Sequence, residues 1–416
     1  MLRLTYACLL AAVIASTGCA TDNGDLGGGA GTCVGKCDSD GTAPWWGVND
    51  VSIIVPLGKA GETALMPSLA NAAQEGVLIS NELWQQIDDG MPLTEGTQAE
   101  VNWPKMRVTS MRFDPCFEQT IPDTSCKRVV RLVSQPVAEY GDVVSVTDAS
   151  LHLFYTLSDD QFVAMLLEYK SLIAGERIDE ALYQHPVLAR AGHGSELFNE
   201  FNQLLTSYLG PDNLFKVTEM ATGRSGNNWF WFVYDRAEDG TYNRGLIPTT
   251  DENMDGFEIA PRPIVPEELP DIPQFPELLL SDVAIDRMTE AELNQAATEI
   301  YAIENPAVTD ATNIKCSSCH VAMRVLDYAF KRRQLPLPVD PTFTAPAGQN
   351  MSVRDESVSR RNMHGLGYFK AAPAVTRRVI KESAVCADVI GSDAFAETLA
   401  PSAREAGDAA REETRE

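Results

Sequence analysis

Positively charged residues are scarce in this chain, and the sequence motifs that bind phosphate groups are missing. The 416 residues include 33 lysines and arginines against 59 aspartates and glutamates, which gives a formal net charge of −26. A protein this acidic repels the phosphate backbone of nucleic acids, and no basic patch in the sequence reverses that. No Walker loop, no GxSxG motif and no GxGxxG run that opens a helix is found. We therefore expect no nucleic-acid partner, and the sequence offers no nucleotide or serine-hydrolase signature.

Long apolar runs are also missing after residue 20, where nothing in the sequence is long enough to cross a membrane. The first twenty residues, MLRLTYACLLAAVIASTGCA, combine one early cation, a short apolar stretch and small residues, as a cleaved export signal does. Residues 16–19 resemble a bacterial lipobox, in which the cysteine receives a diacylglycerol, although Ser16 stands where leucine is usual.

The lipobox resemblance implies a lipoprotein signal peptide over residues 1–19 and a lipid on Cys19. The chain would then be periplasmic or on the cell surface, held at the membrane by its N-terminal lipid. Ala20 is not the aspartate that often retains lipoproteins in the inner membrane, so the outer membrane is favoured. Ordinary signal cleavage with an unmodified Cys19 is the alternative.

Composition divides the mature chain further. Residues 20–45 are rich in glycine and aspartate and predict a flexible tether, in which Cys33 and Cys37 can close a small loop. Residues 46–259 interleave strands and helices, which predicts an α+β domain of unknown function. Residues 260–276 hold six prolines and predict a semi-rigid linker. Residues 277–395 are expected to be helical, and residues 396–416 form a charged tail.

Period-two alternation and capping patterns place the individual elements. The expected strands are rich in β-branched and aromatic residues: 51–57, 106–113, 129–135, 150–157, 215–220 and 228–235. Helices are expected after the capping boxes at 158–161 and 289–292, over 195–209 and 319–332, and from Pro373 onward.

Two cysteines flank a short loop in the N-terminal domain. Cys116 and Cys126 enclose the stretch CFEQTIPDTSC between two expected strands. In an exported protein a disulfide between them is the expected outcome.

The strongest chemical motif is KCSSCHVAM over residues 315–323, a CxxCH run formed by Cys316, Cys319 and His320. A thioredoxin-like dithiol would need a buried strand before the first cysteine, but the polar TDATNIK precedes it. A zinc site would need a second ligand pair at suitable spacing. Haem attachment uses every part of the motif, because two thiols add to the haem vinyl groups and the histidine binds the iron.

Over about residues 277–395 the chain resembles a monohaem c-type cytochrome domain, with helices before and after CxxCH and a C-terminal helix. The resemblance implies haem c, covalent attachment through Cys316 and Cys319, and His320 as the proximal iron ligand. In that family the sixth ligand is commonly a methionine in the loop before the last helix. Met363, ten residues before Pro373, is therefore preferred.

Other sixth ligands stay open. His364 is the first alternative, and Met351, Met323 or an open position follow. A methionine at position 363 can also be a packing residue without chemistry.

Together these features predict an α+β N-terminal domain of mixed strands and helices, followed by an all-α cytochrome c-like domain. The expected function is that of a lipid-anchored electron carrier, rather than a catalyst, that meets a redox partner protein. One alternative is a haem enzyme or gas sensor with an open iron position; the single CxxCH counts against a two-haem peroxidase. The other is a surface-binding module with structural haem.

Overall fold

The computed structural model describes residues 45–89, 103–117, 126–223, 227–259, 278, 281–310, 313–392 and 395. Several predictions from the sequence therefore lie outside the described residues: the signal peptide, Cys19, the tether with Cys33 and Cys37, the proline-rich linker 260–276 and the tail 396–416.

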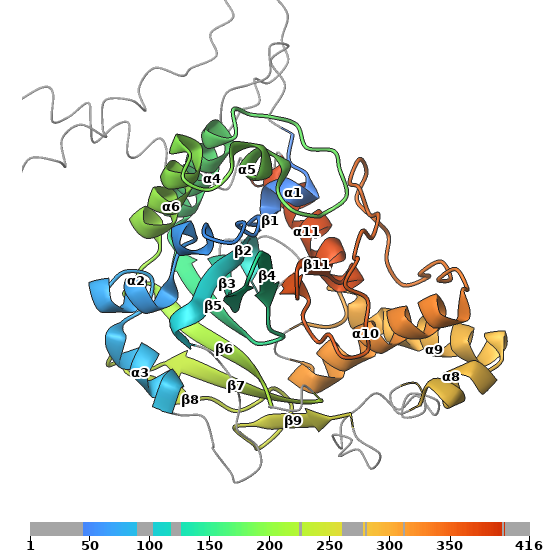
Figure 1. Cartoon of the computed structure of the whole chain (residues 1–416). Helices are drawn as coiled ribbons and strands as arrows, with labels where there is room; N and C mark the ends of the chain where they lie inside the picture. Colours follow the sequence, from blue (N-terminus) through green and yellow to red (C-terminus); the bar gives the residue numbers. More distant parts are fainter. Residues whose placement is uncertain are drawn as a thin grey trace, which may run out of the picture.

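A nine-stranded antiparallel sheet occupies the middle of the described part of the chain (Figure 1). Its main path runs β1-β2-β3-β5-β6-β7-β8, while β4 pairs with β3 and β9 pairs with β7. The strands are β1 (Ser52–Ile54), β2 (Met106–Phe117), β3 (Lys127–Tyr140), β4 (Val143–Val146), β5 (Ser150–Leu157), β6 (Leu214–Thr222), β7 (Asn228–Arg236), β8 (Tyr242–Arg244) and β9 (Asp255–Glu258).

Two groups of helices lie on different sides of this sheet, α1–α6 on one side and α8–α10 on the other (Figure 1). Both predicted capping boxes are confirmed, at the N-termini of α4 and α9. No helix among the described residues is both long and apolar enough to span a membrane. The helices are α1 (Val48–Val51), α2 (Leu69–Glu75), α3 (Asn81–Asp89), α4 (Asp159–Leu172), α5 (Pro186–Ala191), α6 (Glu196–Tyr208), α8 (Asp282–Arg287), α9 (Glu290–Glu304), α10 (Cys316–Arg333) and α11 (Arg377–Ile390).

Two hydrophobic cores meet at the sheet, and β7 shows how. Trp229 and Trp231 pack into the core that contains α8–α10, whereas Phe232 and Tyr234 pack into the larger core that contains α1–α6. Successive side chains of a strand point to opposite faces, so one strand serves both cores. The aromatic residues of the run NWFWF thus pack on both faces of the sheet.

The prediction of an all-α C-terminal domain is wrong. Two strands, β10 (Leu366–Phe369) and β11 (Ala372–Val375), form an antiparallel hairpin in that part of the chain. Pro373 lies in β11 and does not open the last helix; Thr376 is the N-cap residue of α11. The hairpin and α11 pack in the larger core, beside β2, and not in a separate helical domain.

Contacts with distant strands explain why this hairpin forms. An isolated pair of four-residue strands is barely stable in water. Here Gln135 of β3 donates from Nε2 to the Tyr368 carbonyl and accepts from the Tyr368 amide, each at 2.8 Å. The Tyr368 hydroxyl donates to the carbonyl oxygen of Val55 at 2.8 Å. These partners lie more than two hundred residues away, so local sequence patterns carried no sign of them.

Candidate functional site: a cavity between helix α10 and the sheet

The CxxCH motif forms the first two turns of α10. Cys316, Cys319 and His320 are spaced i, i+3 and i+4, which places them on one face of the helix. The N-cap residue Lys315 gives no side-chain cap, and Asp255 of β9 supplies one instead by accepting from the Ser317 amide at 2.7 Å. A carboxylate at this position accepts a hydrogen bond from an amide of the first helical turn, and its negative charge interacts favourably with the positive end of the helix dipole.

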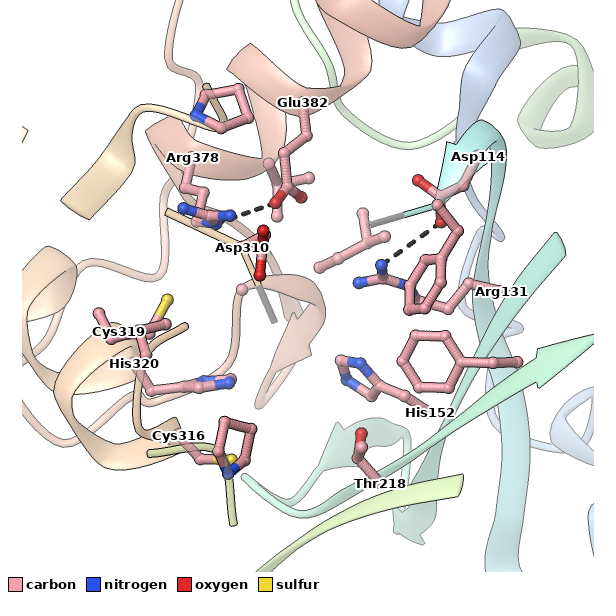
Figure 2. Close-up of a pocket in the computed structure, with 18 of the residues that line it drawn as sticks. Asp114, Arg131, His152, Thr218, Asp310, Cys316, Cys319, His320, Arg378 and Glu382 are labelled. Carbon is pink, nitrogen blue, oxygen red and sulfur yellow. Dashed lines mark ion pairs between the residues drawn. The ribbon is translucent and has the colours of Figure 1, made fainter. Parts of the chain in front are cut away.

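That face of α10 lines a cavity of about 390 Å³ between the helix and the sheet. The volume lies within the roughly 300–1,000 Å³ of small-molecule and cofactor sites. Figure 2 shows the two cysteines and His320 on one side, with His152 and Thr218 on the opposite side. Apolar walls come from Phe154, Met220, Trp231, Leu366 and Val379.

The ring of His320 is held in one orientation by the chain before β10. Its Nδ1 lies 2.5 Å from the carbonyl oxygen of Met363, which can only accept, so Nδ1 carries the proton. Nε2 is then the unprotonated nitrogen. Histidines that bind metals commonly have this arrangement, in which one ring nitrogen donates to a carbonyl and the other is free for the metal.

The two motif cysteines are poor candidates for a redox dithiol. Burial raises the pKa of the Cys316 thiol to about 12, and Asp255 and Cys319 add to that effect. Burial also raises the pKa of Cys319. Reactive thiols have lowered pKa values, so this environment opposes the thioredoxin-like reading. Among the described residues no three histidine, cysteine or acidic side chains converge as a multidentate metal site would require.

A buried charged cluster forms another part of the cavity wall. Arg112 pairs with Asp114 at 2.7 Å and with Glu382, while Arg131 lies 3.4 Å from Asp114 and Arg378 lies 2.9 Å from Glu382. Figure 2 marks the last two of these ion pairs. Burial alone would raise the pKa of Glu382, but Arg112 and Arg378 hold it at about 2. Three guanidinium groups therefore meet two carboxylates, and the cluster has one excess positive charge.

Two buried N–H groups of the cavity wall lack acceptors among the described residues. They are Nε of Arg131 and Nε1 of Trp231. The Trp231 ring lies 5.7 Å from the His320 ring, centroid to centroid. A buried donor without a partner costs about 1–3 kcal/mol, so both groups favour a bound molecule that offers acceptor atoms.

Of the predicted sixth ligands, Met363, His364 and Met351 do not line the cavity. The Met363 side chain packs in the core around α8–α10, and it does not line the cavity. His364 is buried with its Nε2 2.6 Å from the Leu366 carbonyl oxygen. Met351 packs against the larger core. Met323 does line the cavity, but it extends from α10, the same helix as His320.

His152 is the site residue that the sequence did not single out. It lies in β5, among mostly apolar residues, where a histidine is usually structural. The strand sequence SLHLFYTL held a usable signal, because Leu151, Leu153 and Tyr155 share one face and His152 lies on the other. What the strand could not reveal is that α10 would lie across from that second face.

Three further cysteines lie in the same region. Cys116 and Cys126 form the predicted disulfide, with Cα atoms 4.8 Å apart, and Cys116 lines the cavity. Cys386 is partly buried in α11 and also lines the cavity. Burial raises the pKa of Cys386 far above its ordinary value, which keeps it protonated.

No protein-family model, curated protein or solved structure matches this chain. The function of this protein is therefore inferred from the geometry of the cavity.

Proposed function

We propose that this protein is an exported c-type haem protein that carries single electrons. Cys316 and Cys319 hold the haem covalently, and His320 is the proximal iron ligand. One observation carries the proposal: both thiols and the imidazole lie on one face of α10 and line the same cavity. The fixed orientation of His320, with Nδ1 on a carbonyl oxygen, supports it further.

The cavity walls fit the chemistry of the group. Haem is a flat apolar ring with two carboxylates, and the cavity combines apolar walls with a cluster that has one excess positive charge. Arg131 and Arg378 would neutralise propionates, and the unpartnered Nε of Arg131 needs an acceptor. Bound haem supplies an iron that alternates between the ferric and ferrous states.

The rim of the cavity supports electron transfer to a partner. Leu246 and Val308 line the cavity and are 60% and 57% exposed. Exposed apolar side chains beside a cofactor cavity are suited to transient docking, because weak redox complexes use small interfaces. In the proposal a redox partner protein docks at this rim, while a lipid on Cys19 keeps the protein at the membrane, in the periplasm or on the cell surface.

A redox titration tests the electron-carrier function. The full chain is produced in a bacterial host that exports it and carries the haem c maturation system. We expect a reversible transition that fits one electron per protein, and fast oxidation of the reduced form by a small c-type redox partner. A spectrum that stays unchanged over the whole titration range would contradict electron transfer and favour a structural haem.

Matched cysteine variants test where the haem is held. Cys316→Ala and Cys319→Ala together are expected to abolish covalent attachment. Cys386→Ala is the control, because this thiol lines the same cavity but belongs to no CxxCH motif. Equal haem content in all three proteins would refute the assignment of the attachment site.

A further inference from the structure

We propose that His152 of β5 is the second protein ligand of the haem iron, on the side of the cavity opposite His320. This inference rests on the proposed function, and it names the residue at the sixth position. Figure 2 shows the two imidazoles extending toward each other from opposite walls, His320 from α10 and His152 from β5.

The register of the sheet sets the direction of His152. It lies between Val133 of β3 and Thr218 of β6 in the antiparallel ladder. Its strand neighbours Leu151 and Leu153 point into the larger core, so His152 points out of the opposite face, into the cavity. A position in the middle of three paired strands is rigid, which suits a residue that must hold a ligand atom in place.

The hydrogen bonds of the histidines single out His152. The chain has five histidines, all of them described. His185, His193, His320 and His364 each engage a ring nitrogen in a hydrogen bond. Neither ring nitrogen of His152 has a hydrogen-bond partner in the part of the chain that the structure describes, and the half-buried ring faces the cavity. Its nitrogens are therefore free to bind a group held in the cavity.

The backbone around Met363 argues against the alternative. The Met363 carbonyl oxygen accepts from His320 and its amide donates to Asp148 at 2.7 Å. Both main-chain groups are therefore fixed by hydrogen bonds, while the side chain packs in the core around α8–α10 and does not line the cavity. To bind the iron, the Met363 side chain would have to leave that core and enter the cavity.

Two imidazoles at the iron have functional consequences. Both axial positions are filled by the protein, which leaves none open for a gas or a substrate. An imidazole in place of a thioether also favours the ferric state and lowers the reduction potential. The assignment therefore favours electron transfer over the haem-enzyme and gas-sensor alternatives.

Spectroscopy of the haem-loaded full chain and its variants tests the assignment. The parent protein is expected to be low-spin, without the weak red absorption band of a methionine–iron bond, and inert to carbon monoxide. His152→Ala is expected to convert the ferric protein to high spin and to bind carbon monoxide when reduced. Added free imidazole should restore the low-spin spectrum. His152→Met keeps a side chain of similar length, and it should raise the midpoint potential.

The controls separate the two proposals. Met363→Leu keeps the packing volume and the carbonyl that holds His320, and it should leave the low-spin spectrum unchanged. If His152→Ala and His152→Met keep the parent spectrum while Met363→Leu turns high-spin, His152 is not the ligand and haem binding still holds. If the parent protein carries no covalent haem, both proposals fail.

Discussion

The substitution Gln135→Leu tests the finding that the C-terminal hairpin belongs to the N-terminal sheet. Gln135 is fully buried on β3, and its side chain makes four hydrogen bonds, one of them a long one of 3.5 Å to the carbonyl oxygen of Thr147. Its amide group joins the amide and the carbonyl of Tyr368 at 2.8 Å each, and its oxygen accepts from Thr109 at 3.0 Å. Leucine fits the space but removes all four bonds.

The magnitude follows from the groups left unpaired. Each lost hydrogen bond contributes about 1 kcal/mol net, and each buried main-chain group without a partner costs about 1–3 kcal/mol. Because the amide and the carbonyl of Tyr368 both lose their hydrogen-bond partner, we expect the free energy of unfolding to fall by about 3–5 kcal/mol. Urea unfolding followed by far-ultraviolet circular dichroism measures this loss. Hydrogen exchange at the Tyr368 amide should accelerate as well.

A matched substitution provides the control. Gln203 lies on the exposed side of α6, so Gln203→Leu should change the free energy of unfolding by less than about 0.5 kcal/mol. If Gln135→Leu is as mild as Gln203→Leu, the hairpin does not depend on β3 and the C-terminal part is a separate unit after all.

Three further predictions concern the rest of the fold. Gly367→Ala should destabilise the protein by about 2 kcal/mol or more. Gly367 has φ +142°, and a Cβ at this position would lie 2.3 Å from the side-chain oxygen of Gln135. The control is Gly210→Ala, because a Cβ at position 210 meets no other atom within 4 Å. Burial lowers the pKa of His185 to about 3. The unfolded chain therefore binds the extra proton below about pH 6.5, and stability is lost as the pH falls from there, by up to about 1.4 kcal/mol per pH unit; His185→Asn should flatten that slope. Replacing Cys116 and Cys126 by serine should cost about 3 kcal/mol.

Urea unfolding measures all three effects. Equal midpoints for the two glycine variants would contradict the close contact. An unchanged slope between pH 4 and pH 6.5 in the histidine variant would show that other groups govern the acid response. If the serine variant loses less than about 1 kcal/mol of its free energy of unfolding, the disulfide constrains the unfolded chain very little.

Local patterns in the sequence were enough for most of the N-terminal elements. The strand at Ser150–Leu157 has the predicted bounds, β6 and β7 lie where strands were predicted, and both capping boxes form. These features depend on neighbouring residues: alternation within a strand, or a side chain that caps an amide three positions on.

The errors arose where distant contacts decide the structure. The stretch LGYFKAAPAV contains glycine and proline and carries little strand signal, so its hairpin depends on Gln135 and on the larger core. The same limit applies to the site. The CxxCH motif itself could be read from the sequence, but the wall opposite it could not, because nothing local relates His152 to a helix that begins 164 residues later.

The mass of the mature protein under denaturing conditions tests the central claim most directly. The mature protein from a host with the haem c maturation system is expected to be heavier than its polypeptide by one haem, in addition to the lipid on Cys19. A peptide that spans Cys316 to His320 should carry that increment through two thioether bonds. A bare peptide with free thiols, or one with a disulfide between Cys316 and Cys319, would contradict covalent haem and return the dithiol interpretation.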